Sequence, residues 1–258
     1  MNFLRPNGPS SGRATALIVS LYAGASLALW LLYPSEMFPR PSEVASSWMD
    51  MVRTQGLIRE LYSSLMTNLE ALGISCALSL GLAYLSVVPA LRPATAAASK
   101  ARFFGMTGFV VLFTVLFGGG HWLKVSLLVF GMSVFFTTSM ASVVADIPRE
   151  EYDHARTLRM GPWRSVWEVV ILGRADLAIE SLRQNAAIGW MMLTMVEGLS
   201  RSEGGLGTML LNENKHFHLP AIAALQITVL VVGVVQDWAI AGLKRILCPY
   251  ASLSLERR

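Results

Sequence analysis

Residues 151–172 have the sequence EYDHARTLRMGPWRSVWEVVIL, a polar and positively charged stretch between two long apolar segments. A loop that only joins two membrane helices needs a few turn residues, whereas this stretch is long and rich in helix-forming residues. Its one strong break is Gly161-Pro162. We therefore predict two short helices that meet at this bend on the membrane surface and hold a partner.

Composition places the chain among membrane proteins. Hydrophobic residues make up 53% of it and charged residues 15%, against about 25% charged in soluble domains; its mean hydropathy is +0.50. Apolar runs of about 20 residues, the length that a helix needs to cross the hydrocarbon core, recur along the chain. We predict an all-α protein of one transmembrane domain, residues 1–258, with six transmembrane helices near 14–34, 68–90, 103–122, 125–145, 182–199 and 220–243.

The polar segments between these spans indicate the orientation. If the N-terminus is cytoplasmic, most of the 21 lysine and arginine residues lie on the cytoplasmic side, as the positive-inside rule favours. Both termini and the loop 149–174 are then cytoplasmic. The segment 35–66 is external, and its apolar residues recur at the spacing of one or two amphipathic helices lying at the interface.

No catalytic set is recognisable in the sequence. G-x-S-x-G, H-E-x-x-H and Walker A patterns are absent, and His216-Phe-His218 has no third ligand nearby, so we predict no metal site and no enzyme activity. The excess of basic residues reflects topology, since no basic stripe with interleaved aromatics points to nucleic acid. Membrane lipid is the expected surrounding partner.

The 151–172 stretch resembles the EAA loop of ABC importer permeases, in the form found in the nitrate/sulfonate/bicarbonate (taurine-type) branch. There, E-A-A-R-T-L-G-A-S-x-W precedes an aliphatic run ending in L-P. Asp153-His-Ala-Arg-Thr-Leu158 stands in place of E-A-A-R-T-L, Trp163 matches the tryptophan, and Val169-Val-Ile171 matches the aliphatic run. Arg159 replaces the family's glycine and Leu172 its proline, so we place the bend at Gly161-Pro162.

The resemblance extends from about residue 36 to the end of the sixth span. Phe38-Pro-Arg-Pro-Ser-Glu-Val44 is similar to the family's P-x-P-S-x-V. Further along, Trp190, Glu197 and Gly205-Leu-Gly207 are similar to its W…E…G-L-G pattern. This implies a type I importer permease fold in a prokaryotic cytoplasmic (inner) membrane, with a second permease copy, most simply as a homodimer.

The resemblance also implies partners and residue roles. The chain binds no cofactor; ATP and Mg²⁺ bind a cytoplasmic ABC ATPase dimer, and an extracytoplasmic substrate-binding protein delivers the solute. The loop 149–174 forms coupling helices in a groove of the ATPase, where small Ala155 allows close approach. The coupling residues are Asp153, Ala155, Arg156, Leu158, Arg159, Gly161, Trp163 and Arg164. Candidates for the pathway or its gate are Trp190, Met191, Met195, Glu197, Gly205 and Gly207.

The expected solute is a small anion or organic acid, such as nitrate or a sulfonate, because the resembled branch handles such compounds. An alternative is a stand-alone secondary transporter driven by an ion gradient. It predicts carboxylates near the bilayer midplane or an internal repeat, and neither is visible. A membrane enzyme needs convergent acid, base or metal ligands, and none is visible. The long cytoplasmic loop favours the permease over both.

Overall fold

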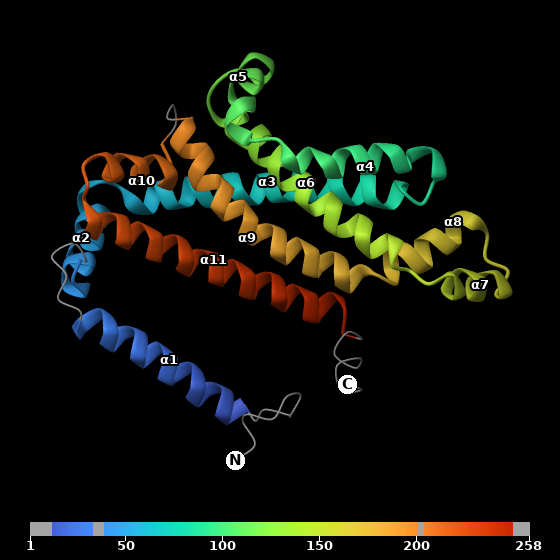
Figure 1. The fold of residues 1–258 in the computed structure, drawn as a ribbon, viewed down its shortest axis with the longest axis horizontal. Helices are drawn as coiled ribbons and strands as arrows, with labels where there is room; N and C mark the ends of the chain where they lie inside the picture. The colour runs from blue at the N-terminus through green and yellow to red at the C-terminus, as the bar shows by residue number, and fades with distance from the viewer. Residues whose placement is uncertain (1–11, 33–38, 201–203, 250–258) are drawn as a thin grey trace.

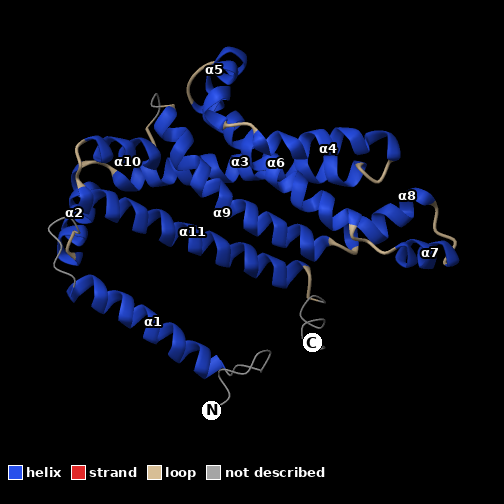
Figure 2. Cartoon of the chain, viewed as in Figure 1, coloured by secondary structure: helices blue, strands red, loops and turns tan. Residues whose placement is uncertain are grey.

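The computed structural model describes residues 12–32, 39–200 and 204–249, and every regular element in these ranges is helical (Figure 2). Four long helices form the body: α3 (Leu57–Leu85), α6 (His121–Ala145), α9 (Ala175–Leu199) and α11 (Leu219–Leu247). Within the body, α3 packs on α6, α6 on α9, and α9 on α11 (Figure 1). The predicted all-α class is confirmed.

Within the described ranges, four helices are long and apolar enough to cross a membrane: α1 (Gly12–Leu32), α3, α6 and α11. Helix α9 has 25 residues, but it carries Asp176, Glu180, Arg183 and Glu197 and is therefore less apolar. A bent pair of shorter helical segments makes a fifth candidate span. The six-span topology thus stays a prediction.

The predicted third span, 103–122, differs most from the structure. Its helix, α5 (Met106–Phe117), has 12 residues. That length corresponds to about 18 Å, short of a hydrocarbon core of about 30 Å. The preceding segment comprises η1 (Pro89–Leu91), α4 (Arg92–Lys100) and η2 (Ala101–Phe103), and it lies at 115° to α5. Helix α5 ends early because the chain turns at Gly118 and Gly120, whose φ angles are +77° and +82°.

The second span also has different limits. It was predicted at 68–90, but α3 begins at Leu57, so residues 57–66 belong to this long helix and not to the external segment. A separate amphipathic helix, α2 (Pro41–Thr54), precedes it, while residues 35–38 lie outside the described residues. Helix α2 packs on α11, where Trp48 Nε1 donates a hydrogen bond to Thr228 Oγ1 at 3.2 Å.

The remaining predicted spans coincide with helices. Residues 125–145, 182–199 and 220–243 fall within α6, α9 and α11. Helix α1 covers the first span up to Leu32, and its residues 33 and 34 lie outside the described residues. In Figure 1, α1 lies apart from the body, and none of its apolar window is buried within the chain. Such a helix needs lipid or another protein around it.

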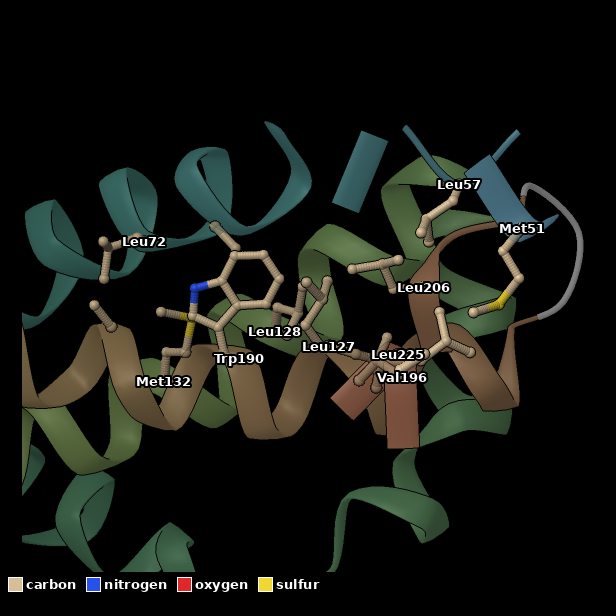
Figure 3. Packing of buried hydrophobic residues seen from close by; sticks show 14 of the residues in the cluster. Met51, Leu57, Leu72, Leu127, Leu128, Met132, Trp190, Val196, Leu206 and Leu225 are labelled. Carbon is tan, nitrogen blue, oxygen red and sulfur yellow. The ribbon is translucent and has the colours of Figure 1, made fainter. Parts of the chain in front are cut away.

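A cluster of buried apolar side chains joins α2, α3, α6, α9 and α11 to the short helix α10 (Leu206–Lys215) (Figure 3). Trp190 lies near its middle, with Met132 and Leu128 beside it. The core therefore holds α9 against the other long helices, and it fixes the position of the residues that were candidates for the pathway.

Candidate functional site

The loop 149–174 contains the two short helices that its sequence predicts. They are α7 (Arg149–Thr157) and α8 (Pro162–Ser165), and α8 continues into a π-helix, η3 (Val166–Leu172). Figure 1 shows α7 and α8 at one end of the molecule, beyond the ends of α6 and α9. A seven-residue π-helix is unusual, and such irregularities are frequent at functional sites.

The bend between α7 and α8 is made by Arg159, whose φ is +55°. The Arg159 N–H donates to the Arg156 carbonyl at 2.9 Å, and the Met160 N–H donates to the Ala155 carbonyl at 3.1 Å. This pair of bonds is the Schellman motif that ends helices, usually with glycine in the left-handed position. Gly161 is extended, with φ −68° and ψ 162°. The predicted bend at Gly161-Pro162 is therefore wrong in its position.

The residues predicted to contact a partner lie mostly on the loop's surface. Trp163 is 70% exposed and Leu158 59%, and a further exposed side chain, Trp167, accompanies them. Asp153, Arg156, Arg159, Gly161 and Arg164 are exposed as well. Ala155 is only 4% exposed within the chain itself. It therefore lies on the inner side of the loop, where its small side chain serves the loop's own packing.

The loop is firmly attached to the long helices. Val170 of η3 is fully buried and clusters with Val144 and Ile147 at the end of α6. Arg174, just before α9, donates to Glu151 of α7 at 2.5 Å. The loop is thus attached to the end of α6 and to the start of α9.

A cleft of about 560 Å³ lies between α9 and α11. Its lining combines apolar side chains with a few polar ones, as is typical of small-molecule sites. Trp190, Met191 and Thr194 come from α9, and Gln226 and Gln236 come from α11. This cleft brings two of the candidate pathway residues, Trp190 and Met191, to one surface.

A buried amide joins three helices behind this cleft. Gln236 Oε1 accepts hydrogen bonds from Trp190 Nε1 at 2.7 Å and from Asn68 Nδ2 at 3.2 Å. Gln236 Nε2 has no hydrogen-bond partner among the described residues, although the residue is only 8% exposed. Gln236 and Asn68 are not among the predicted site residues, because the prediction rested on acidic residues within spans. The signal that could have identified them is an uncharged amide side chain within an apolar helix.

The mouth of the cleft near the loop is bounded by charged side chains. Glu180 accepts hydrogen bonds from Arg183 at 2.7 Å and from Lys244 at 2.9 Å, and Arg183 also donates to Asp237 at 3.3 Å. These ion pairs tie α9 to α11. Arg183 lines the cleft, and its charge is compensated by two carboxylates.

At the other end of α9, Glu197 holds the start of α10. Its carboxylate is 1% exposed and accepts hydrogen bonds from Ser64 Oγ at 2.7 Å and from the Gly207 N–H at 2.8 Å. The Gly205 N–H donates to Glu60 at 2.5 Å. Glycine is needed here, because a Cβ on Gly205 would overlap the Glu197 carboxylate.

We call this set of contacts around Glu197, Ser64, Glu60, Gly205 and Gly207 the clamp, and Lys124 of α6 completes it. It is 3% exposed, and its Nζ donates to the Gly204 carbonyl at 2.7 Å. The clamp connects α3, α6, α9 and α10, and the sequence analysis singled out only part of it. Ser64 and Glu60 carried no signal of their own, because hydroxyl and acidic residues near a helix end are common.

The structure thus divides the six pathway candidates into three groups. Trp190 joins the amide cluster, whereas Glu197, Gly205 and Gly207 meet in the clamp, about two helical turns away. Met191 and Met195 are 67% and 42% exposed. Exposed methionines beside a cleft indicate a surface that is completed by something outside the single chain.

Comparison with known proteins identifies the family of the chain and a solved structure with a similar fold. The family model described as "Binding-protein-dependent transport system inner membrane component" matches residues 77–245. No curated protein matches the chain. Among solved structures, a chain from the inward-facing MetNI methionine ABC transporter superposes with a TM-score of 0.67 at 13% identity, covering 75% of this chain and 97% of that one. At that identity the likeness shows the fold alone.

Proposed function

Since the chain belongs to the family of inner membrane components of binding-protein-dependent transport systems, we propose that two copies of it form the translocation pathway of an importer driven by a separate ATPase. The chain is the permease component of an ABC importer and not an enzyme itself. ATP and Mg²⁺ then bind to the ATPase dimer, and an extracytoplasmic binding protein delivers the solute.

The exposed face of α7 and α8 carries this proposal. Leu158 and Trp163 are large apolar side chains exposed to solvent, which is unfavourable unless a partner covers them. Nearby in the sequence, Arg156, Arg159 and Arg164 add positive charge to the surface. Such a surface suits a groove with apolar pockets and an acidic rim. Because Val170 and Arg174 attach the loop to α6 and α9, closure of the ATPase dimer would move both helices as a rigid body.

The cleft between α9 and α11 is the proposed half-site of the pathway. A second copy facing Met191 and Met195 would enclose it, which favours a homodimer. Gln236 Nε2 is a hydrogen-bond donor with no partner among the described residues, and one end of the cleft carries Arg183 beside its partner Asp237. The unpaired amide donor and the arginine support the proposal of a small anion or organic acid, such as nitrate or a sulfonate.

The proposed orientation follows from the loop. If α7 and α8 contact a cytoplasmic ATPase, the clamp around Glu197 lies at the external side of the inner membrane, where it would position α10 beside the binding protein. Both chain termini are then cytoplasmic. Helix α10 donates buried hydrogen bonds from the Leu206 N–H to Ser64 of α3 and from the Gly207 N–H to Glu197 of α9, so it can serve as a fixed part of the external gate.

The test is co-purification of the full chain with its ATPase in mild detergent. We expect Trp163→Ala to reduce ATPase recovery at least about tenfold, since buried interface tryptophans are frequent hot spots. Trp122→Ala is the matched control, because Trp122 is 60% exposed at the opposite end of α6. If both variants retain the ATPase, or both lose it, the loop is not the specific contact and the proposal fails.

A further inference from the structure

A second large cavity lies at the ends of α3 and α6 nearest the loop. It has a volume of about 560 Å³ and is closed by α4 on one side and by the start of α7 on the other. Ala141, Val144 and Ala145 of α6 line it, as does Ile147 just after the helix. The cavity therefore sits where two membrane helices leave the hydrocarbon, directly beneath the helix that we propose contacts the ATPase.

Its polar lining is basic. Arg92 and Arg149 line the cavity, while no acidic side chain does. Asp146 and Glu150 neighbour Arg149 in sequence but do not line the cavity, and Glu151 is paired with Arg174. Two arginines without a facing carboxylate are the usual recognition elements for a phosphate group.

Several hydrogen-bond donors in the cavity are free to bind a ligand. The Arg92 side chain uses only its Nε, which donates a long hydrogen bond of 3.4 Å to the Ser86 carbonyl. The side chains of Arg149 and Ser99 have no hydrogen-bond partner among the described residues. Tyr152 adds a phenol hydroxyl. Burial, helped by the nearby Glu151 carboxylate, raises the pKa of Tyr152 further above neutrality, where a tyrosine hydroxyl is already protonated.

An apolar cavity lies farther along the same helices. It measures about 440 Å³, and its lining from α3, α5 and α6 is almost entirely carbon, with Phe113, Phe117 and Phe130 among its residues. Helix α4 contributes to both cavities, with Ser99 in the basic one and Ala98 in the apolar one, and Ala101 of η2 also lines the apolar one. A ligand that suits both has an anionic head and a hydrocarbon tail.

We propose that the basic cavity binds the phosphate headgroup of an anionic phospholipid, whose acyl chain extends toward the apolar cavity. Basic pockets between membrane helices at the cytoplasmic surface bind such headgroups in other proteins. A bound lipid would bridge α4 to α7 through Arg92 and Arg149. It would therefore steady the base of the coupling loop and make transport sensitive to the charge of the surrounding membrane.

The test is native mass spectrometry of the full purified chain titrated with phosphatidylglycerol and, separately, with phosphatidylcholine. We expect wild type to bind phosphatidylglycerol at least about tenfold more tightly, and Arg92→Gln/Arg149→Gln to lose that preference. Lys100→Gln/Arg102→Gln is the matched control. It removes the same charge, from α4 and η2, but neither residue lines the cavity. Arg92→Lys/Arg149→Lys keeps the charge and is expected to keep most of the preference.

Three outcomes would overturn the proposal. Equal loss in both glutamine pairs would show general attraction to a basic surface. Displacement of the lipid by equimolar inorganic phosphate would assign the cavity to a soluble anion. Unchanged lipid preference in Arg92→Gln/Arg149→Gln would show that the two arginines do not bind the headgroup. The binding assay contains no ATPase and measures no transport, so its failure is distinguishable from failure of the proposed function.

Discussion

Arg159 adopts a backbone conformation that glycine adopts at much lower cost. A residue with a Cβ loses roughly 1–2 kcal/mol in the left-handed helical region, because the Cβ approaches the following carbonyl oxygen. Arg159 nevertheless ends α7 there, at the position where the resembled family has glycine. The charge that arginine adds to the exposed face of the loop is the only evident compensation.

We therefore expect Arg159→Gly to stabilise the isolated chain by about 1 kcal/mol while weakening its hold on the ATPase. Thermal unfolding of the detergent-purified chain measures the first effect, and co-purification measures the second. Arg156→Gly is the control, because residue 156 lies inside α7, where glycine costs about 1 kcal/mol. Equal destabilisation by both variants would contradict the left-handed conformation of Arg159.

The position of this bend shows one limit of sequence reasoning. Gly161-Pro162 carries the strongest local break signal in the loop, and the prediction followed it. The structure instead ends α7 by a Schellman motif, in which the residue at one defined position must be left-handed whatever its type. No heavy atom lies within 4 Å of a Cβ built on Gly161. The proline begins α8, and the glycine is not required for the turn.

At the scale of elements, the contact between α9 and α10 depends on the absence of a side chain at residue 207. A Cβ on Gly207 would overlap the carbonyl oxygen of Thr194, which belongs to the α9 backbone and cannot easily move. It would also displace Glu197, whose carboxylate accepts the Gly207 N–H. The close approach of the two helices explains the second glycine of the Gly205-Leu-Gly207 pattern in physical terms.

We expect Gly207→Ala to destabilise the chain by about 2 kcal/mol or more through overpacking, and to lower transport in reconstituted vesicles. Gly198→Ala tests the same helix pair from the other side. A Cβ there meets its nearest atom, the Gly207 carbonyl oxygen, at an ordinary 3.7 Å. That variant is expected to unfold at or slightly above the wild-type temperature. A similar loss in both variants would mean that helix packing in general, and not this contact, is sensitive.

Elements were predicted well where one physical signal dominated. Uninterrupted apolar runs predicted α6 and α11, because nothing in those segments competes with a membrane-length helix. The third span was predicted on the same basis, but Gly118 and Gly120 adopt positive φ and stop α5 at Phe117. The start of α3 was missed because residues 57–66 include charges, which the helix tolerates at its exposed beginning.

At the scale of the whole molecule, the single chain leaves a large apolar surface uncovered. Helix α1 packs little against the described body, Met191 is exposed in the lining of the cleft, and Met195 and Trp238 are exposed on α9 and α11. A lipid environment satisfies α1, but the cleft also contains Gln226, Gln236 and charged groups at its mouth. Polar groups of this kind are costly next to hydrocarbon. The surface around the cleft is therefore expected to face protein or water.

The sequence could indicate this arrangement only indirectly. Trp190 and the methionines were recognised as pathway candidates, whereas the amide cluster that positions Trp190 depends on Asn68, more than a hundred residues earlier in the chain. Contacts of that kind follow from the packing of both α3 and α11 against α9. Neither residue spacing nor composition reports them without a fold.

A homodimer with the cleft at its centre predicts that Met191 of one copy lies near Met191 of the other. With Cys76 and Cys248 replaced by serine, Met191→Cys is expected to give a covalent dimer with a short bismaleimide cross-linker in native membranes. Val115 on α5 is 79% exposed, and Val115→Cys is expected to stay monomeric at the same reagent concentration. Addition of ATP should change the yield only at residue 191, since closure of the ATPase dimer moves α9 through the loop. A dimer formed through residue 115 alone would place the two-fold axis at α5 and refute the proposed pathway.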